Sequence, residues 1–529
     1  MHDDLQVIRI YEMERCLSDG QIPCRWAPDM GAGYGQPMFN FYGPFPYYLG
    51  TLIRIMFPIS IIGTVKLLFI ISLLVSAFGM YILVREFWGR KAGILSAVLY
   101  AYAPYHALDI FVRGALSELF ALAIIPLLLY GIYKVVLERK LESILVTSTS
   151  IFILFTSHNI SSLIYSPFIV IWVLFWVFRI KNWKSFADLT FAGILGLGLS
   201  SFFLLPNLLE QSLIQKESLV EGYYIYSSHF VSLSQLFTER DWGYGPSTFG
   251  PMDEMSFQIG WPHWWIGILI VVLAAFNFKN KKKKYVLIST LLLSLAGISA
   301  FMTHLRSHLI WENISLLRFV QFPWRFLGLT TFFLSFAGGV LLRLFNSRKN
   351  YIFWGIVLLT IVLNFNFSKP EHYWSWATDQ EKLSGIQFEI QQKAAILDYL
   401  PITANEAPKE LAFDQPNLVE GEGTAYNFSE RSNRFFFDAD VQEDATFQIP
   451  IMFYPGWVAL ENGTILGSYP SGEFGLITLE LTKGRHIIQG RFIETPIRRF
   501  SNLITLLMFL LIIFSVAYKK NRGSFLGFT

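Results

Sequence analysis

Charged side chains stand near the ends of long apolar stretches, where burying a charge is costly unless it is paired or used. The first two are Asp3 and Asp4, beside His2. Paired carboxylates can hold a divalent cation, and one carboxylate can accept a proton while its neighbour tunes it. The same aspartates can instead cap the helix expected over residues 4–17, so the sequence leaves catalysis, metal binding and capping open.

A second group of charges lies in the segment from His106 to Glu118. Asp109 and Arg113 are four residues apart, and this spacing forms an ion pair on a helix without any further function. Glu118 lies deeper, just inside an apolar stretch, where an idle carboxylate is less expected. Glu118 is therefore the stronger candidate for chemistry in this segment.

Two further candidates stand at turns between apolar stretches. His158 follows Ser157 at a tight turn, where an imidazole can act as an acid, a base or a donor, although a lone histidine is more often structural. Arg325 ends the segment Gln321-Phe322-Pro323-Trp324-Arg325 and suits a two-point contact with a phosphate. The alternative for Arg325 is that its side chain reaches towards lipid headgroups.

Apolar helices must position these residues. The chain is 53% hydrophobic and 15% charged, whereas soluble domains carry roughly 25% charged residues. We therefore predict a polytopic α-helical membrane protein, and the small net charge of +3 gives no reason to expect nucleic-acid binding. We predict about 11 transmembrane helices, at residues 61–84, 92–108, 115–136, 143–157, 159–178, 187–206, 262–278, 285–302, 325–343, 351–367 and 500–518.

Lysine and arginine gather in alternate gaps between these segments, as in Lys279–Lys284 and Lys519-Lys520. Cytoplasmic loops hold such an excess, so the other gaps are predicted to be extracytoplasmic. The predicted organisation is a first external loop (1–60), a transmembrane domain (61–367) with external loops 207–261 and 303–324, an external domain (368–499), and a last span with a cytoplasmic tail (500–529). An external start requires a preceding apolar span or unaided insertion, and we expect a missing N-terminal helix.

The external segments have distinct characters. Residues 45–58 are predicted to form an interfacial helix, and Cys16 and Cys24 can pair in an oxidising compartment or remain incidental thiols. Residues 368–499 end in alternating apolar and polar runs separated by turn signals such as Asn462-Gly463. This pattern predicts an antiparallel β-sandwich.

Several motifs resemble the bacterial membrane proteins called "6-pyruvoyl-tetrahydropterin synthase related", a label that does not describe a pterin enzyme. The resemblance extends over nearly the whole chain and departs at the N-terminus, where that family usually has a transmembrane helix before the His-Asp motif. It rests on these segments: His2-Asp3, Gly20-Gln21-Ile22-Pro23, Arg25-Trp26, Gly33-Tyr34-Gly35, Phe39-Asn40-Phe41-Tyr42, Arg113 to Glu118, Ser157-His158-Asn159, Ser256-Phe257-Gln258-Ile259-Gly260 and Gln321-Phe322-Pro323-Trp324-Arg325.

Such proteins are similar in layout to GT-C glycosyltransferases, which take sugars from polyprenyl phosphates and carry an acidic residue in the first external loop. The resemblance implies transfer of a sugar to an extracytoplasmic glycan, lipid or protein at the cell membrane, with Mg or Mn as a candidate cofactor. A transporter or flippase of lipid-linked sugars and a non-catalytic envelope assembly protein are the alternatives. The predicted site comprises catalytic residues Asp3, Asp4 and Glu118, substrate-binding residues Arg25, Asp109, Arg113, His158, Gln321 and Arg325, and metal ligands Asp3 and Asp4.

Overall fold

The computed structural model describes residues 2–248, 250, 253–277, 283–345 and 349–525. Most of the basic cluster Lys279–Lys284, which anchored the predicted topology, lies outside these described residues. The chain divides into two compact units that are interleaved along the sequence and cut across the predicted segment boundaries. The first unit comprises Met1–Asp4, Lys66–Gly196 and Leu219–Trp374, and the second comprises Leu5–Val65, Leu197–Ser218 and Ser375–Thr529.

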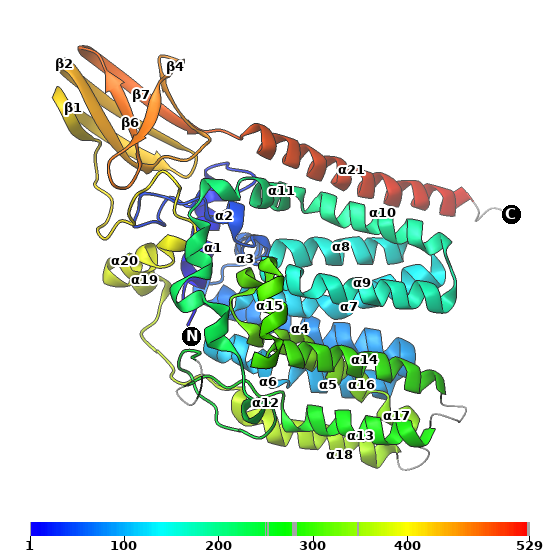
Figure 1. Ribbon diagram of the computed structural model, residues 1–529. Helices are drawn as coiled ribbons and strands as arrows, with labels where there is room; N and C mark the ends of the chain where they lie inside the picture. Colours follow the sequence, from blue (N-terminus) through cyan, green and yellow to red (C-terminus); the bar gives the residue numbers. More distant parts are fainter. Residues whose placement is uncertain (1, 249, 251–252, 278–282, 346–348, 526–529) are drawn as a thin grey trace. The chain divides into compact units, whose positions relative to one another are not determined.

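The first unit is a helical bundle (Figure 1). Its helices are α4 (Ile61–Trp88), α5 (Arg90–Ala101), α6 (Pro104–Ala107), the π-helix η1 (Leu108–Arg113), α7 (Leu116–Glu138), α8 (Leu141–Ser157), α9 (Asn159–Ile180), α10 (Lys184–Leu199), α12 (Leu233–Phe237), α13 (Trp261–Asn277), α14 (Lys283–Met302), α15 (His308–Asn313), the 3₁₀ turns η7 (Ser315–Val320) and η8 (Pro323–Phe326), α16 (Leu327–Gly338), α17 (Leu341–Leu344) and α18 (Lys349–Asn364). Two of them, α4 and α10, cross the boundaries between the units.

The centre of this bundle is the helix α16. All twelve of its residues are buried, and it packs against α5, α13 and α14. The helix α7 is also largely buried and packs against α8 and α9. A helix that is apolar around its whole circumference belongs inside a bundle, because it has no polar face for water. The residues at the beginnings of α7 and α16 are therefore held by two of the most buried helices of the unit.

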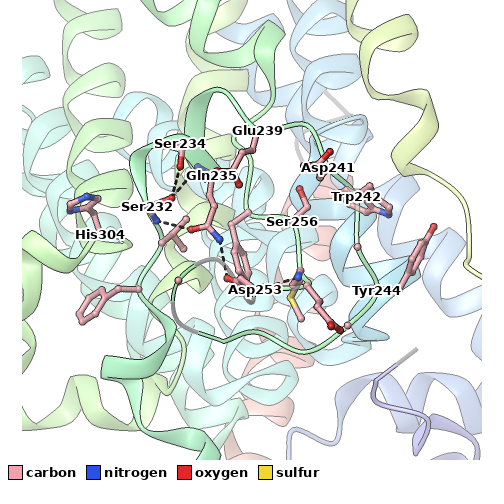
Figure 2. A pocket seen from close by; sticks show the side chains of 18 of the residues that line it. Ser232, Ser234, Gln235, Glu239, Asp241, Trp242, Tyr244, Asp253, Ser256 and His304 are labelled. Atoms are coloured by element: carbon pink, nitrogen blue, oxygen red, sulfur yellow. Dashed lines mark hydrogen bonds between the residues drawn. The ribbon is translucent and has the colours of Figure 1, made fainter.

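A long loop follows the helix α11 (Ser201–Leu209) and contains little regular structure. Ser232 caps the short helix α12, and Tyr244 forms an isolated antiparallel bridge with Met255. Figure 2 shows this loop and the side chains that gather around it. The bridge and the capping interaction give the loop a defined course although it has no extended strand.

The second unit combines the first segment of the chain with the C-terminal sheet. Its helices and strands are α1 (Gln6–Ser18), α2 (Met38–Phe41), α3 (Phe45–Met56), α11 (Ser201–Leu209), α19 (Asp379–Lys382), α20 (Gly385–Lys393), β1 (Asn417–Arg431), β2 (Arg434–Met452), β3 (Trp457–Glu461), β4 (Thr464–Leu466), β5 (Ser468–Ser471), β6 (Leu476–Leu481), β7 (Gly484–Phe492) and α21 (Pro496–Phe525). Trp26 lies in the core of this unit and contacts Tyr454, Trp457 and Phe492. The N-terminal segment and the sheet therefore share one hydrophobic core.

The predicted antiparallel β-structure is confirmed, but its strands form one sheet rather than the two separate sheets of a sandwich. The sheet has seven strands in the order β4-β3-β7-β2-β6-β5, with β1 paired to β2. The 19-residue strand β2 pairs with β7 along its first half and with β6 along its second half. A continuous strand therefore joins the two halves that a sandwich would separate, and bulges between β1 and β2 allow the bend.

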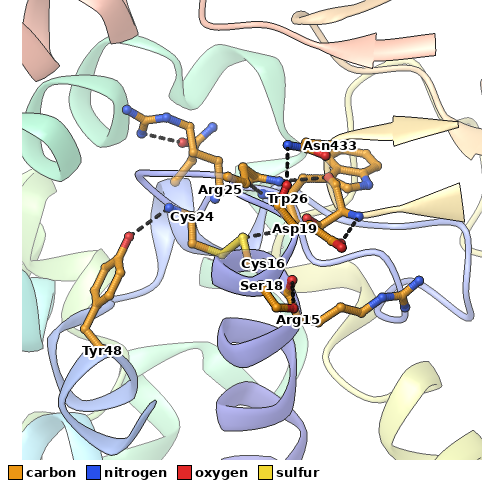
Figure 3. Close-up of a disulfide and its surroundings, with 12 residues drawn as sticks. Arg15, Cys16, Ser18, Asp19, Cys24, Arg25, Trp26, Tyr48 and Asn433 are labelled. Carbon is orange, nitrogen blue, oxygen red and sulfur yellow. Dashed lines mark hydrogen bonds between the residues drawn. A yellow bond between two sulfur atoms is a disulfide. The ribbon is translucent and has the colours of Figure 1, made fainter. Parts of the chain in front are cut away.

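A disulfide joins Cys16 and Cys24 (Figure 3). It links the end of α1 to the irregular segment that carries Arg25 and Trp26. Both cysteines are buried, and the hydroxyl of Tyr48 accepts a hydrogen bond from the backbone nitrogen of Cys24 at 2.8 Å. Of the two readings of these cysteines, pairing is the one that the structure confirms.

Apolar helices confirm a polytopic membrane protein. Among the described residues, seven helices are long and apolar enough to cross a membrane, or up to nine if each of two bent pairs is one span. The bent pairs are α5 with α6–η1, at 45°, and α10 with α11, at 75°. The segments α8 and α13 are helical but shorter, so the predicted count of eleven spans stays a prediction.

Candidate functional site

A change of helix type positions the charges of the segment from His106 to Glu118. The helix α6 continues into the π-helix η1, which contains Asp109 and ends at Arg113. Gly114 then takes a left-handed conformation (φ 67°), and Glu118 stands in the first turn of α7. Single π turns often occur at functional sites. A helix N-terminus also favours a negative charge, so α7 helps to hold the Glu118 carboxylate.

Glu118 accepts hydrogen bonds from two neighbours inside the bundle. Its Oε2 accepts from Arg113 Nη2 at 2.8 Å, and its Oε1 accepts from the Tyr105 hydroxyl. Arg113 also donates to Asp109. Asp109 and Glu118 are almost fully buried. Because an unpaired buried charge is costly, Arg113 compensates both carboxylates at once.

Arg325 brings a second guanidinium to the same carboxylate. Its Nε lies 3.5 Å from Glu118 Oε2, close enough for an ionic contact but without a hydrogen bond. Its Nη1 donates to the Val320 carbonyl at 2.8 Å and to Gln321 Oε1 at 3.2 Å. Gln321 has a positive φ of 64°, which is unusual for a residue other than glycine and fixes the turn before η8. Arg325 is therefore held in place mainly through neutral partners.

Trp324 lies against the arginine cluster and connects it to the long loop. The Arg113 guanidinium lies 4.6 Å from the Trp324 ring centroid. The indole nitrogen of Trp324 donates to Ser247 Oγ at 3.1 Å, and His229 Nδ1 lies 2.9 Å from the same oxygen. Such stacking on an aromatic face suits arginine.

The segment that carries Asp3 and Asp4 is anchored beside Arg113. The backbone nitrogens of His2 and Asp3 donate to the carbonyls of Val112 and Arg113, at 2.9 and 2.8 Å. His2 Nε2 also lies 2.7 Å from the Tyr244 carbonyl oxygen. Asp3 is half-buried and Asp4 is exposed. The structure therefore places the predicted acidic pair at the end of η1.

His158 lies near this cluster and has a structural role of its own. It caps α9, because its Nδ1 accepts from the Ser161 backbone nitrogen at 3.2 Å. The charges of Glu118 and Arg325 act on its ring. The structural reading of this histidine is thus supported, and its predicted role in substrate binding stays a prediction.

Arg25 belongs to the second unit, whereas the other predicted site residues belong to the first. It is almost fully buried and donates to Glu494, to Asn40 and Asn502, and to the Phe202 carbonyl, at 2.8–3.0 Å. This network accounts for Arg25 through packing within its unit. Its role in substrate binding stays a prediction that nothing in the geometry supports.

The predicted metal site at Asp3 and Asp4 lacks a third ligand from the described residues. No group of three or more histidine, cysteine, aspartate or glutamate side chains in this part of the chain could hold a metal ion. Mg²⁺ can be bound by one or two carboxylates if water and substrate oxygens complete its shell. A metal at this position would therefore depend on the substrate for its remaining ligands.

Residues 39–369 match the family model described as "6-pyruvoyl-tetrahydropterin synthase related domain; membrane protein". This match spans more than half of the chain. The chain belongs to this family of membrane proteins. In this 6-pyruvoyl-tetrahydropterin synthase related protein, the matched region includes Arg113, Glu118 and Arg325, whereas Asp3 and Arg25 precede it.

A relative of this family member occurs in Lactococcus lactis subsp. cremoris (strain MG1363), where it is named an uncharacterized protein. The two are 25% identical over 292 residues, which cover 53% of this chain and 46% of the relative. The chain thus spans about half the length of that relative. That name assigns no activity to the relative.

Two contacts of the cluster were not among the predicted site residues. Tyr105 donates to Glu118, and Trp324 stacks under Arg113. Tyr105 lies one residue before His106, and Trp324 lies one residue before Arg325. Aromatic residues are common at membrane interfaces, so neither residue could be distinguished from the interfacial aromatic residues by sequence alone.

Proposed function

We propose that the protein is a membrane glycosyltransferase that moves a sugar from a polyprenyl-phosphate donor to an extracytoplasmic acceptor. The proposal includes a GT-C-like layout with eleven spans and an extracytoplasmic sheet domain. The disulfide Cys16–Cys24 lies in the same unit as the sheet and is typical of an oxidising compartment. It therefore supports an extracytoplasmic position for that unit.

The observation that carries the proposal is the link from Arg325 through Glu118 and Arg113 to the backbone of Asp3. Arg325 is buried, and its Nε has no hydrogen-bond partner among the described residues, so this guanidinium can donate to a phosphate oxygen. Asp3 is bonded through its backbone to Arg113, which shares Glu118 with Arg325. A candidate base and a candidate phosphate ligand thus belong to one connected group of residues.

The reaction divides between these two residues. The Asp3 carboxylate takes the proton of the acceptor hydroxyl, whose oxygen forms a bond to the anomeric carbon of the sugar. The bond between that carbon and the donor phosphate oxygen breaks, and its electron pair leaves with the polyprenyl phosphate. Arg325 stabilises the departing phosphate. Glu118 keeps both arginines in position, and Asp4 remains near the base as an exposed second carboxylate.

The test uses the full chain in liposomes with radiolabelled polyprenyl-phosphate hexoses and an envelope extract from cells that lack the protein. Asp3→Asn should reduce turnover by roughly 10²–10⁴-fold, the usual scale for a positioned acid or base, while donor binding persists. Arg325→Ala should instead weaken donor binding, because a charge-assisted contact is lost. Arg318→Ala removes an exposed arginine of the same segment and should change neither quantity.

Thermal unfolding must first show that each variant is folded. Near-normal transfer by Asp3→Asn would remove Asp3 from the mechanism. If Arg325→Ala binds donor as the wild type does, the phosphate site is wrong. The two results are independent, because one reports on turnover and the other on donor affinity.

A transporter of lipid-linked sugars is the second candidate, and the two bent helix pairs favour it. Broken spans are common in transporters, where they place polar backbone and charges within the membrane. The break between α5 and α6 lies directly before the charged η1. Movement of labelled donor across the liposome bilayer, without transfer of its sugar to any acceptor, would support transport and overturn the transferase.

A further inference from the structure

A cavity of about 1140 Å³ opens beside the long loop of the first unit. Ligand pockets commonly measure about 300–1,000 Å³, so this cavity has room for more than one sugar ring. Its walls come from described residues of the loop, between Phe230 and Gly245, at Gly250 and from Asp253 to Phe257, together with His304, Leu305 and Glu371. Figure 2 shows polar and aromatic side chains surrounding it from several parts of the loop.

Negative charge dominates the lining of the cavity. No lysine or arginine is found among the described residues that line it. Like charges brought close together without a cation are unfavourable, so a phosphate or a sugar acid is repelled here. Five carboxylates contribute to this charge: Glu239, Asp241, Asp253, Glu254 and Glu371.

Hydrogen bonds hold one wall of the cavity in place. Gln235 Nε2 donates to Asp253 Oδ2 at 3.0 Å, and Gln235 Oε1 accepts from the Ser232 backbone nitrogen at 2.8 Å. The other oxygen of Asp253 accepts from the Met255 backbone nitrogen at 3.3 Å. The dashed lines in Figure 2 follow these bonds across the loop. A carboxylate fixed in this way presents acceptors to a ligand without having to be ordered first.

Aromatic rings form the opposite part of the lining. Trp242 stacks on Phe367 with ring centroids 4.8 Å apart, and the Tyr244 hydroxyl donates to the Lys369 carbonyl at 2.8 Å. Both Trp242 and Tyr244 are half-buried and line the cavity. Flat apolar faces next to a few fixed polar groups are typical of sites for small polyhydroxylated ligands.

The cavity is connected to the charged cluster within the same unit. The Tyr244 carbonyl contacts His2, whose neighbour Asp3 is bonded to Arg113. On another side, Phe257 stacks on Trp324 with ring centroids 5.3 Å apart. Two lining residues, Tyr244 and Phe257, therefore contact residues next to the proposed base and the proposed phosphate ligand.

We infer that this cavity binds the acceptor, and that the acceptor is a saccharide carrying hydroxyl or amine groups but no phosphate or carboxylate where it enters the site. This inference rests on the proposed function, because only a transferase has an acceptor. Binding of a saccharide in the cavity does not itself require transfer. Carboxylates accept hydrogen bonds from hydroxyl and ammonium groups, and the rings pack against sugar faces. The anionic end of the donor is thereby kept with the arginines.

Isothermal titration of the full chain in nanodiscs tests the inference with three tetrasaccharides: maltotetraose, a chitosan tetramer and a tetragalacturonate. The first two should bind, and tetragalacturonate should bind at least tenfold more weakly. The double variant Glu239→Lys with Asp241→Lys replaces two exposed carboxylates and should reverse this order. Glu221→Lys is the control, because it changes an exposed glutamate outside the lining. This variant should bind the three tetrasaccharides in the same order as the wild type.

The outcomes separate this inference from the proposed function. Equal binding of all three oligosaccharides, tighter binding of tetragalacturonate, or no binding of any of them would overturn the acceptor site even if sugar transfer is observed. Selective binding that is reversed by the double variant would support the cavity as a saccharide site even if no transfer is found. Trp242→Phe, which keeps an aromatic ring, should retain binding, whereas Trp242→Ala should weaken it at least tenfold.

Discussion

Glu118 is surrounded by donors, and this determines what it can do. Tyr105 and Arg113 donate to its two oxygens, and Arg325 makes an ionic contact with one of them. A general base needs an oxygen that can take a proton from a substrate. The geometry therefore favours Glu118 as a positioning residue, and its predicted catalytic role is less well supported than that of Asp3.

Replacing Glu118 should destabilise the protein more than replacing Asp3. Glu118→Gln leaves Arg113 with one carboxylate and Arg325 with none, inside the bundle. Breaking a buried ion pair by removing one partner costs about 3–5 kcal/mol. In thermal unfolding in detergent, the midpoint should fall markedly for Glu118→Gln and change little for Asp3→Asn. Equal midpoints for both variants would mean that the arginines find other compensation.

Asp253 should make stability depend on pH. Burial, reinforced by nearby Glu239, raises the pKa of the Asp253 carboxyl to about 6, although Gln235 and two backbone nitrogens oppose the rise. Because the folded state favours the protonated form, the stabilisation is present at low pH and is lost as pH rises through about 6. The unfolding midpoint of the wild type minus that of Asp253→Asn should therefore fall between pH 4 and 7. A difference that stays constant over this range would contradict the shift.

At the scale of elements, the sequence patterns predicted where the helices lie, but they did not predict the contacts between elements. Within the described residues, all eleven predicted segments are mainly helical, although 92–108 and 187–206 are each interrupted by a break. The alternating runs from Phe447 onwards predicted the second half of β2 and the later strands but not β1, and the pairing of β2 with both β6 and β7 depends on its uninterrupted length. Local patterns carry no information about such long-range pairing. The partners of Arg25, up to 477 residues away, were unpredictable for the same reason.

The turn before α2 depends on a glycine. Gly35 has a φ of 80°, and a Cβ at this position would collide with the Trp26 indole. Gly35→Ala should cost roughly 1–2 kcal/mol for the left-handed backbone, plus about 1–3 kcal/mol for overpacking. Gly20→Ala is a matched control, because Gly20 has the same φ and open space around it. Equal losses of unfolding free energy in the two variants would show that Trp26 moves aside.

At the scale of the whole molecule, the predicted topology and the disulfide are two independent indications of which side of the membrane each part of the chain faces. Basic loops predict which gaps are cytoplasmic. The disulfide concerns only the compartment of the second unit.

The candidate cluster was largely predictable, because charges at the ends of apolar segments are few. The cavity was not, since its lining depends on how an irregular loop folds back on itself.

The topology predicted from the basic loops and the compartment indicated by the disulfide can be tested together with single-cysteine variants. A cysteine at Glu221 or Ile465 should react with an impermeant thiol reagent in intact cells, whereas one at Lys140 should react only after lysis. All three positions are exposed, and both native cysteines are paired. Labelling at Lys140 in intact cells would reverse the topology and remove the outer-side argument for the site.

The interleaving of the second unit has a consequence for biosynthesis. Trp26 needs Tyr454, Trp457 and Phe492 to complete its core. A ribosome adds roughly 5–20 residues per second, so the first segment waits on the order of tens of seconds for these partners. During that time its aromatic side chains are exposed while the helices between them enter the membrane. The segment around Trp26 is therefore made long before the strands that complete its core, and it has to be kept from misfolding until they arrive.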